Sequence, residues 1–290
     1  MEDLEEFAMC IPGCLETVRA SLSRRAIPIA SNGLRPAADA ASASPAKAHA
    51  VRTNTGAGPF TSVLDLTHTL SPAFPVFPGD PVIEVTPFAT LHDDGYNMKA
   101  WHLVEHSGTH LDAPIHFADN GASVEAIDAA TLIAPLAAVD ITAKVQHSAD
   151  AVLSRDDLSE WEARHGRLPE GACVAMHSGW GMFAITDPER YIGRDTDGTL
   201  HFPGIANDAA RWLIEERQIV GLAVDTLSLD HGPSRDFPVH RLWLPSGRWG
   251  LENVANLDQA PAVGAVLVIG LPKVKGATGA PVRLLALLPG

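Results

Sequence analysis

Residues 106–116 read HSGTHLDAPIH, and this stretch holds three imidazoles and one carboxylate in eleven positions. These side chains occupy positions i, i+4, i+6 and i+10, and they are His106, His110, Asp112 and His116. Gly108, Thr109 and Pro114 all disfavour a continuous helix. In an extended chain, side chains alternate with a period of two, so all four would project to one side. We therefore expect an extended segment that gathers its ligand-type side chains around one point.

Two neutral imidazoles and a carboxylate form a three-ligand set for a divalent cation. Such a set leaves positions open for water, as in catalytic rather than closed structural sites. On this basis His106, His110 and Asp112 are interpreted as metal ligands. Taken from the residues alone, His116 has two interpretations, as a fourth ligand or as a base beside the metal-bound water.

The composition narrows the class of protein. The chain has 290 residues, 46% of them hydrophobic and 19% charged, which predicts a packed core and not global disorder. A net charge of −14 repels phosphate backbones, so nucleic acid is not an expected partner. No apolar run reaches the ~18 residues needed to cross a bilayer, so a membrane is not an expected partner either. Three cysteines cannot form a disulfide framework in a chain of this size.

The first 58 residues differ from the rest because they are rich in alanine and lack apolar periodicity. We interpret residues 1–58 as a disordered leader outside the fold, followed by one domain over residues 59–290. Arg24 and Arg25 resemble part of a degenerate twin-arginine export signal, but Pro28 interrupts the apolar stretch that should follow. A cytoplasmic location is favoured, and a periplasmic one is the alternative if the leader is an export signal.

Short apolar runs bounded by Gly, Pro and Asp predict strands along the remaining chain, among them residues 136–141, 173–177 and 220–225. Ser154 and Asp157 form a capping-box start for a helix that ends before Gly166. Residues 207–217 predict a second amphipathic helix. Strands outnumber helices, so the expected fold is a mixed α/β domain with a β-rich core.

The motif at residues 106–116 resembles the signature of the metal-dependent cyclase family of hydrolases, which includes bacterial kynurenine formamidases and isatin hydrolases. Residues 75–80, PVFPGD, are similar to the proline-rich loop of that family, and residues 224–230 to its later strand and turn. The segment from Asp187 to Phe202 resembles the insertion of isatin-hydrolase-like members. The resemblance extends from Asp65 to the C-terminus.

This resemblance implies a swivelling β/β/α fold, a homodimer or homotetramer, and zinc or manganese with one or two ions per chain. It implies that His240 and Glu252 bind a second ion and that Asp112 bridges the two. It also implies that His116 is the catalytic histidine. Formamidase-type members would place the protein in tryptophan catabolism.

The predicted reaction is hydrolysis of an amide C–N bond in a small aromatic substrate such as N-formylkynurenine or isatin. Metal-bound hydroxide would attack the carbonyl, and His116 would act as general acid and base. Four aromatic residues are candidates for binding the ring, namely Phe74, Phe77, Trp180 and Trp243. The alternatives are a non-catalytic metal-binding or ligand-binding member of the same fold, and a cyclase or lactonase that acts on a different small carbonyl compound.

Overall fold

The computed structural model describes residues 60–289, which fold around one nine-stranded sheet. The order of the strands across the sheet is β1-β13-β11-β5-β7-β9-β10-β4-β12. The neighbouring pairs β5–β7, β7–β9 and β9–β10 are parallel, and the pairs on both flanks are antiparallel. The strands in this order are β1 (Phe60–Asp65), β13 (Arg283–Pro289), β11 (Val266–Gly270), β5 (Ile133–Asp140), β7 (Cys173–His177), β9 (Gly221–Val224), β10 (Trp249–Glu252), β4 (His110–Asp112) and β12 (Gly279–Pro281).

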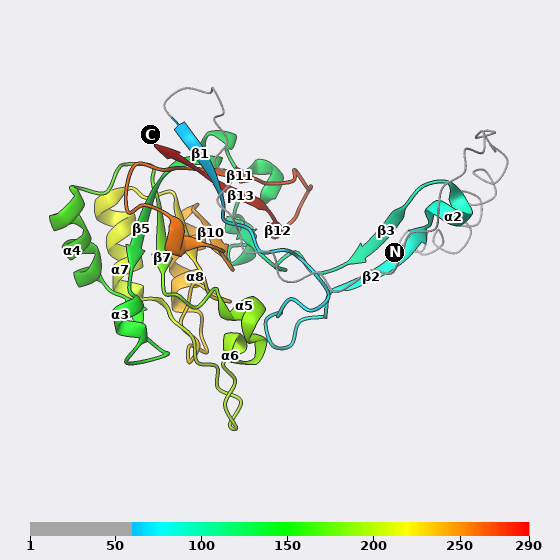
Figure 1. Cartoon of the computed structure of the whole chain (residues 1–290). Coiled ribbons are helices and arrows are strands. Elements are labelled where there is room, and N and C mark those ends of the chain that lie inside the picture. The colour runs from blue at the N-terminus through cyan, green and yellow to red at the C-terminus, as the bar shows by residue number, and fades with distance from the viewer. Residues whose placement is uncertain (1–59, 290) are drawn as a thin grey trace, which may run out of the picture. The chain divides into compact units, whose positions relative to one another are not determined.

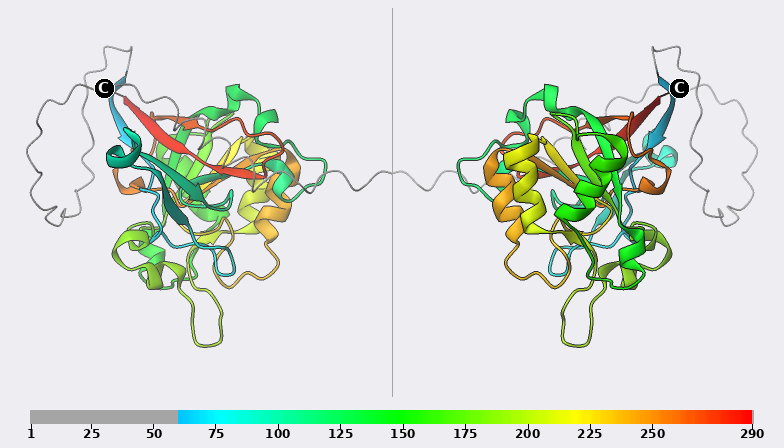
Figure 2. Two further views of the ribbon diagram at one scale, coloured as in Figure 1. Left: turned by 90° about the vertical axis from the view of Figure 1, so that its right-hand side faces the viewer. Right: turned by 90° about the vertical axis from the view of Figure 1, so that its left-hand side faces the viewer.

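Helices cover one face of the parallel strands, as the green, yellow and orange helices of Figure 2 show. The main ones are α4 (Arg155–His165), α7 (Asn207–Trp212) and α8 (Pro238–Trp243), and the short ones are α3 (Thr142–Val145), α5 (Phe183–Thr186) and α6 (Pro188–Ile192). A π-helical turn, Leu213–Arg217, continues α7. Buried side chains from α4, α7 and α8 and from β5, β7 and β9 form one core cluster, whereas α5 and α6 contribute buried side chains to a separate cluster.

The antiparallel strands β1, β11 and β13 supply much of a second core cluster on the opposite face of the sheet. Strand β7 shows why both faces must be covered. Val174 and Met176 face the helical cluster, whereas Cys173 and Ala175 face the other one. A parallel strand that is buried on both faces has a nearly continuous apolar sequence, which is the pattern of residues 173–176.

A hairpin extends from this domain, away from the nine-stranded sheet (Figure 1). It consists of β2 (Glu84–Ala89), the short helix α2 (Leu91–Asp94) and β3 (Met98–His102). All five residues of β3 are exposed, and β2 pairs only with β3. A further small sheet pairs β6 (Val152–Leu153) with β8 (Gly204–Ile205).

The expected β-rich α/β fold is confirmed, and so are its main helices. Helix α4 begins after Ser154 with a full capping box and ends at Gly166. The predicted helix over residues 207–217 has the expected bounds, but its second half is π-helical. Within residues 60–289, no helix is long and apolar enough to cross a membrane. The leader prediction for residues 1–58, including Arg24 and Arg25, lies outside the described residues.

Candidate metal centre

Strand register brings ligand-type residues that are far apart in sequence to one face of the sheet. Strand β4 lies antiparallel to β10, and His110 is opposite Glu252. Since side chains alternate along a strand, His110, Asp112 and Glu252 share a face. Leu111, between the first two, points into the core on the other side. The extended conformation predicted for residues 106–116 is correct for β4 only, because Pro114 begins a 3₁₀ turn that ends at His116.

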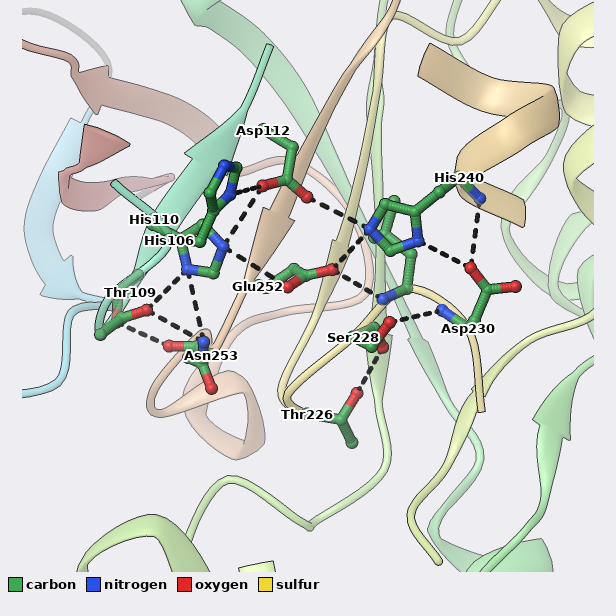
Figure 3. Close-up of polar contacts among 12 residues, drawn as sticks. His106, Thr109, His110, Asp112, Thr226, Ser228, Asp230, His240, Glu252 and Asn253 are labelled. Carbon is green, nitrogen blue, oxygen red and sulfur yellow. Dashed lines mark hydrogen bonds and ion pairs between the residues drawn. The ribbon is translucent and has the colours of Figure 1, made fainter. Parts of the chain in front are cut away.

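Two groups of potential metal ligands meet at this face. His106, His110 and Asp112 form one, and Asp112, His240 and Glu252 form the other. Within each group the ligand atoms lie within 4.8 Å of one another. Asp112 belongs to both groups. Figure 3 shows the carboxylates of Asp112 and Glu252 between the rings of His110 and His240.

Hydrogen bonds on the outer side of two imidazoles define which nitrogen faces the centre. Nδ1 of His110 lies 2.9 Å from the carbonyl oxygen of Gly108, and Nδ1 of His240 lies 2.6 Å from a carboxylate oxygen of Asp230. Both outer partners are acceptors, so each Nδ1 carries a proton and donates it. The inner Nε2 atoms of neutral rings therefore present lone pairs to the centre.

The lone pairs on these Nε2 atoms face the lone pairs of carboxylate oxygens. Nε2 of His110 lies 3.3 Å from Asp112 Oδ1 and 3.4 Å from Glu252 Oε2, and Nε2 of His240 lies 3.1 Å from Glu252 Oε1. Nε2 of His110 and Oδ2 of Asp112 are buried without a hydrogen-bond partner. Buried acceptors that face one another need a positive charge between them. The donor set therefore fits a divalent cation bound by nitrogen and oxygen.

The pKa values of His110 and Asp112 also indicate that the centre needs a positive charge. Burial alone lowers the pKa of His110, but the carboxylates of Asp112 and Glu252 raise it to about 10. Burial opposes ionisation of Asp112, yet the neighbouring imidazoles of His106, His110 and His240 hold its pKa well below the usual range. The carboxylates thus stay charged and attract a proton onto the ring. A metal ion in the centre meets the same demand for positive charge.

Asp230 orients His240 from the loop between β9 and α8. Its carboxylate accepts from the backbone N–H of Val239 at 2.8 Å and of His240 at 3.2 Å, in addition to the His240 ring. One side chain thus binds both the first turn of the helix and the imidazole on it. Phe237, just before the helix, has the left-handed conformation with φ 49°, which is rare for a bulky residue.

His116 lies at the edge of the centre. Its ring stacks on that of His106 with a centroid distance of 4.0 Å, and its centroid lies 6.1 Å from that of His240. Burial lowers the pKa of His116 to about 4. The ring is therefore neutral at pH 7 and has a lone pair free to accept a proton.

The four aromatic residues predicted to bind substrate have different surroundings. Trp243 is fully buried in the helical core, where its indole N–H donates to the carbonyl of Trp249. Phe74 and Trp180 are buried in a third cluster. Phe77 is half-buried, and its ring lies 6.1 Å from that of Phe237.

Sequence reasoning missed several residues that support the ligands. Asn253 donates to the carbonyl oxygen of Gly108, which also accepts from His110, and Tyr191 donates to the Asn253 side chain at 2.8 Å. Tyr191 belongs to the segment from Asp187 to Phe202, so that segment reaches the back of the centre. Asn253 follows Glu252 directly in the sequence, and this adjacency was a usable signal. Nothing in the spacing of Asp230 or Tyr191 marks them.

The donor set fits a divalent cation, and comparison with known proteins identifies the family of the chain. Residues 64–231, more than half of the chain, match the family described as "Putative cyclase". The chain belongs to this cyclase family.

The relatives of the chain include hydrolases. The isatin hydrolase of Roseibium aggregatum is 34% identical over 245 residues, which cover 78% of this chain and 92% of the relative. The kynurenine formamidase of Salinibacter ruber is 27% identical over 225 residues, which cover 77% and 95%. A crystal structure of an isatin hydrolase bound to the product analogue thioisatinate superposes with a TM-score of 0.77 at 31% identity, covering 82% of this chain and 95% of that one.

Proposed function

We propose that the protein is a metal-dependent amidohydrolase that cleaves a C–N bond in a small aromatic substrate such as isatin or N-formylkynurenine. The observation that carries this proposal is the set of buried acceptors that face one another, His110 Nε2, Asp112 and Glu252. The similarity to an isatin hydrolase and a kynurenine formamidase supports the substrate class.

We propose His106, His110 and Asp112 as the ligands of one ion, and Asp112, His240 and Glu252 as those of a second. Zinc and manganese both suit this mixed nitrogen and oxygen donor set. A divalent cation bound here would lower the pKa of a water molecule and polarise the substrate carbonyl. Asp112 would be shared by the two ions, and this assignment is supported by its two oxygens: Oδ1 faces His106 and His110, whereas Oδ2 lies 3.5 Å from His240 Nε2.

His116 is the proposed general acid and base. Its neutral ring accepts a proton from the attacking water and returns it to the nitrogen that leaves, because an amine cannot leave as its anion. The stack on His106 holds the ring beside the ligands. The half-buried Phe77, Phe117 and Phe237 form a chain of rings at 5.9–6.1 Å, and Phe117 lies 4.9 Å from the His240 ring. These three phenyl rings suit an aromatic substrate.

Hydrolysis of a small panel tests the activity. Isatin, N-formylkynurenine and a simple lactone are offered to the protein as purified, after removal of metal by a chelator, and after zinc or manganese is restored. We expect hydrolysis of at least one amide, its loss with the chelator and its return with the ion. Activity that survives complete metal removal would refute the proposal, and turnover of the lactone alone would favour the lactonase alternative.

Glu252→Gln distinguishes two ions from one. In a two-ion site this variant weakens a hard anionic donor of the second ion, so occupancy should fall from about two towards one. In a one-ion site Glu252 does not bind the ion but orients a ligand or a water molecule. Its loss then lowers metal affinity or activity by ~10–100-fold, and the number of ions per chain stays the same. Metal titration of both proteins makes the distinction. One ion per chain in both proteins at saturating metal contradicts the second ion.

We further propose that the exposed hairpin docks on a second copy of the chain, in a homodimer or homotetramer. Among the described residues, six of the eleven exposed large apolar side chains lie between Val82 and Trp101. An isolated two-stranded hairpin is marginally stable in water at best, and exposed apolar patches of this kind mark interaction surfaces.

A further inference from the structure

His106 is the only ligand of the proposed centre that precedes β4, and its ring is held differently from the other two imidazoles. Nδ1 lies 2.7 Å from Asp112 Oδ1 and therefore faces the centre. Nε2 lies on the outer side, 3.0 Å from the hydroxyl oxygen of Thr278. A hydroxyl both donates and accepts, so this contact alone does not define which nitrogen carries the proton.

Glu105 removes that ambiguity. The hydroxyl of Thr278 donates to Glu105 Oε2 at 2.5 Å, and the backbone N–H of Thr278 donates to the same oxygen at 2.8 Å. A threonine hydroxyl has one hydrogen, and the carboxylate takes it because an ionised carboxylate only accepts. Towards His106, the Thr278 oxygen is left with lone pairs. Nε2 must therefore donate, and in the neutral ring Nδ1 then holds the lone pair.

The backbone around Thr278 fixes this arrangement. Its carbonyl accepts from the N–H of Ala113 at 2.8 Å, directly after Asp112. Gly279, the next residue, pairs with Asp112 in the β12–β4 ladder. A Cβ atom on Gly279 would lie 2.6 Å from Cε1 of His106. The ring therefore packs closely against Gly279, where no side chain fits.

We infer that Glu105 and Thr278 are positioning residues, which lock His106 in the tautomer that presents Nδ1 to the first metal position. The inference rests on the proposed metal centre, and it adds residues that are not themselves ligands. The carboxylate also acts on the ring through the hydroxyl: negative charge behind a donating N–H makes the opposite nitrogen a better donor to a cation.

The contacts from Glu105 through Thr278 to His106 form a relay, and the metal affinity of two Thr278 variants tests it. Thr278→Val keeps the shape of the side chain and removes the hydroxyl, whereas Thr278→Ser keeps the hydroxyl. The zinc affinity of the first site is measured by competition with a chelator. We expect Thr278→Val to weaken zinc binding about 10–100-fold, the range for loss of such an outer partner, and Thr278→Ser to stay within about twofold of wild type. Thr131→Val removes a hydroxyl that accepts from Trp249 and serves as the control, with unchanged affinity expected.

The relay is refuted if Thr278→Val binds zinc as tightly as wild type, or if Thr278→Ser is as weak as Thr278→Val. A second measurement needs no substitution at Thr278. Long-range ¹⁵N–¹H spectra of the zinc-loaded wild type, assigned with His106→Asn, should show the proton on Nε2 of His106; a proton on Nδ1 overturns the inference. A wild-type protein that binds no metal at all instead refutes the proposed function, so the two failures are distinguishable.

Discussion

In most proteins apolar side chains are buried and ionisable ones are exposed, and the metal centre and the hairpin of β2 and β3 depart from this pattern in opposite ways. The centre buries ionisable groups, since Asp112, His240 and Glu252 are each less than 10% exposed. The hairpin exposes apolar groups, with Leu91 65% and Trp101 46% exposed. Buried charges are costly unless they are paired, and large exposed apolar patches are rare on monomers.

Both departures indicate a missing partner, and the chemistry of each region describes that partner. On the face of the sheet, acceptors face acceptors, which suits the proposed cation. On the hairpin, apolar side chains face water, which suits the proposed second copy of the chain. A change in one of these two regions should leave the other region intact.

The largest expected effect is that of Asp112→Asn on activity. Asp112 serves both ligand groups, so this change removes the only shared anionic donor. We expect both ions to be lost and hydrolysis to fall to the limit of detection, while the oligomeric state stays that of wild type. Metal analysis and size-exclusion chromatography with light scattering measure the two outcomes. Full metal occupancy in Asp112→Asn would show that the ligand assignment is wrong.

His116→Ala should leave the ligands in place and remove the acid–base group. We expect metal content near that of wild type and a kcat lowered by roughly 10²–10⁴, the range for a positioned acid–base residue. The affinity for metal is the control measurement in the same protein. Loss of metal in step with activity would instead make His116 a ligand.

A change in the hairpin should act on assembly alone. The triple variant of Phe88, Met98 and Trp101 to serine removes three exposed apolar side chains. We expect it to shift the protein towards monomers, with metal content unchanged. Ile133→Ser and Ile185→Ser, at exposed sites outside the hairpin, serve as controls and should not change the oligomeric state. A monomeric wild type, or a triple variant that associates as wild type does, contradicts the proposed interface.

Local signals account for the part of the structure that the sequence predicts. Helix α4 has its capping box at Ser154 and its stop at Gly166, both of which are short-range features. The motif at residues 106–116 gathers its ligands within eleven residues, and the resemblance to a known family supplied His240 and Glu252. The β-rich class followed from apolar runs, which are the strongest local signal for strands.

Non-local contacts account for what was missed. Strand β10 is only four residues long and contains Gly250, so its sequence has no clear strand pattern. Gly250 is there because it lies opposite Asp112, where a Cβ would come within 2.8 Å of Leu229. Thr278 contacts His106 across a sequence separation of 172 residues. Register and sheet order decide such contacts, and a single sequence does not define them.

His68 shows how burial changes the pKa of an imidazole that has no carboxylate beside it. Its ring packs at 5.5 Å from Phe74, and its Nε2 is buried without a partner. Burial lowers the pKa of His68 to about 4, whereas the carboxylates beside His110 raise the pKa of that ring to about 10. The same side chain is thus uncharged in one place and attracts a positive charge in the other.

The smallest expected effect is a change in the pH dependence of stability, which follows from the lowered pKa of His68. Between pH 6.5 and 4 the unfolded chain binds a proton at His68 and the folded chain does not, so the free energy of unfolding falls as the pH falls through this window. For a full shift, the loss from pH 7 to pH 5 is on the order of 1–2 kcal/mol. His68→Gln does not titrate, so it should lose less stability than wild type by about this amount, whereas His147→Gln, at an exposed position, should lose as much as wild type. Denaturant unfolding of the three metal-free proteins at pH 7 and pH 5 measures the difference. If wild type and His68→Gln lose equal free energy of unfolding between pH 7 and pH 5, the pKa of His68 is not lowered in the folded chain, and this prediction is wrong.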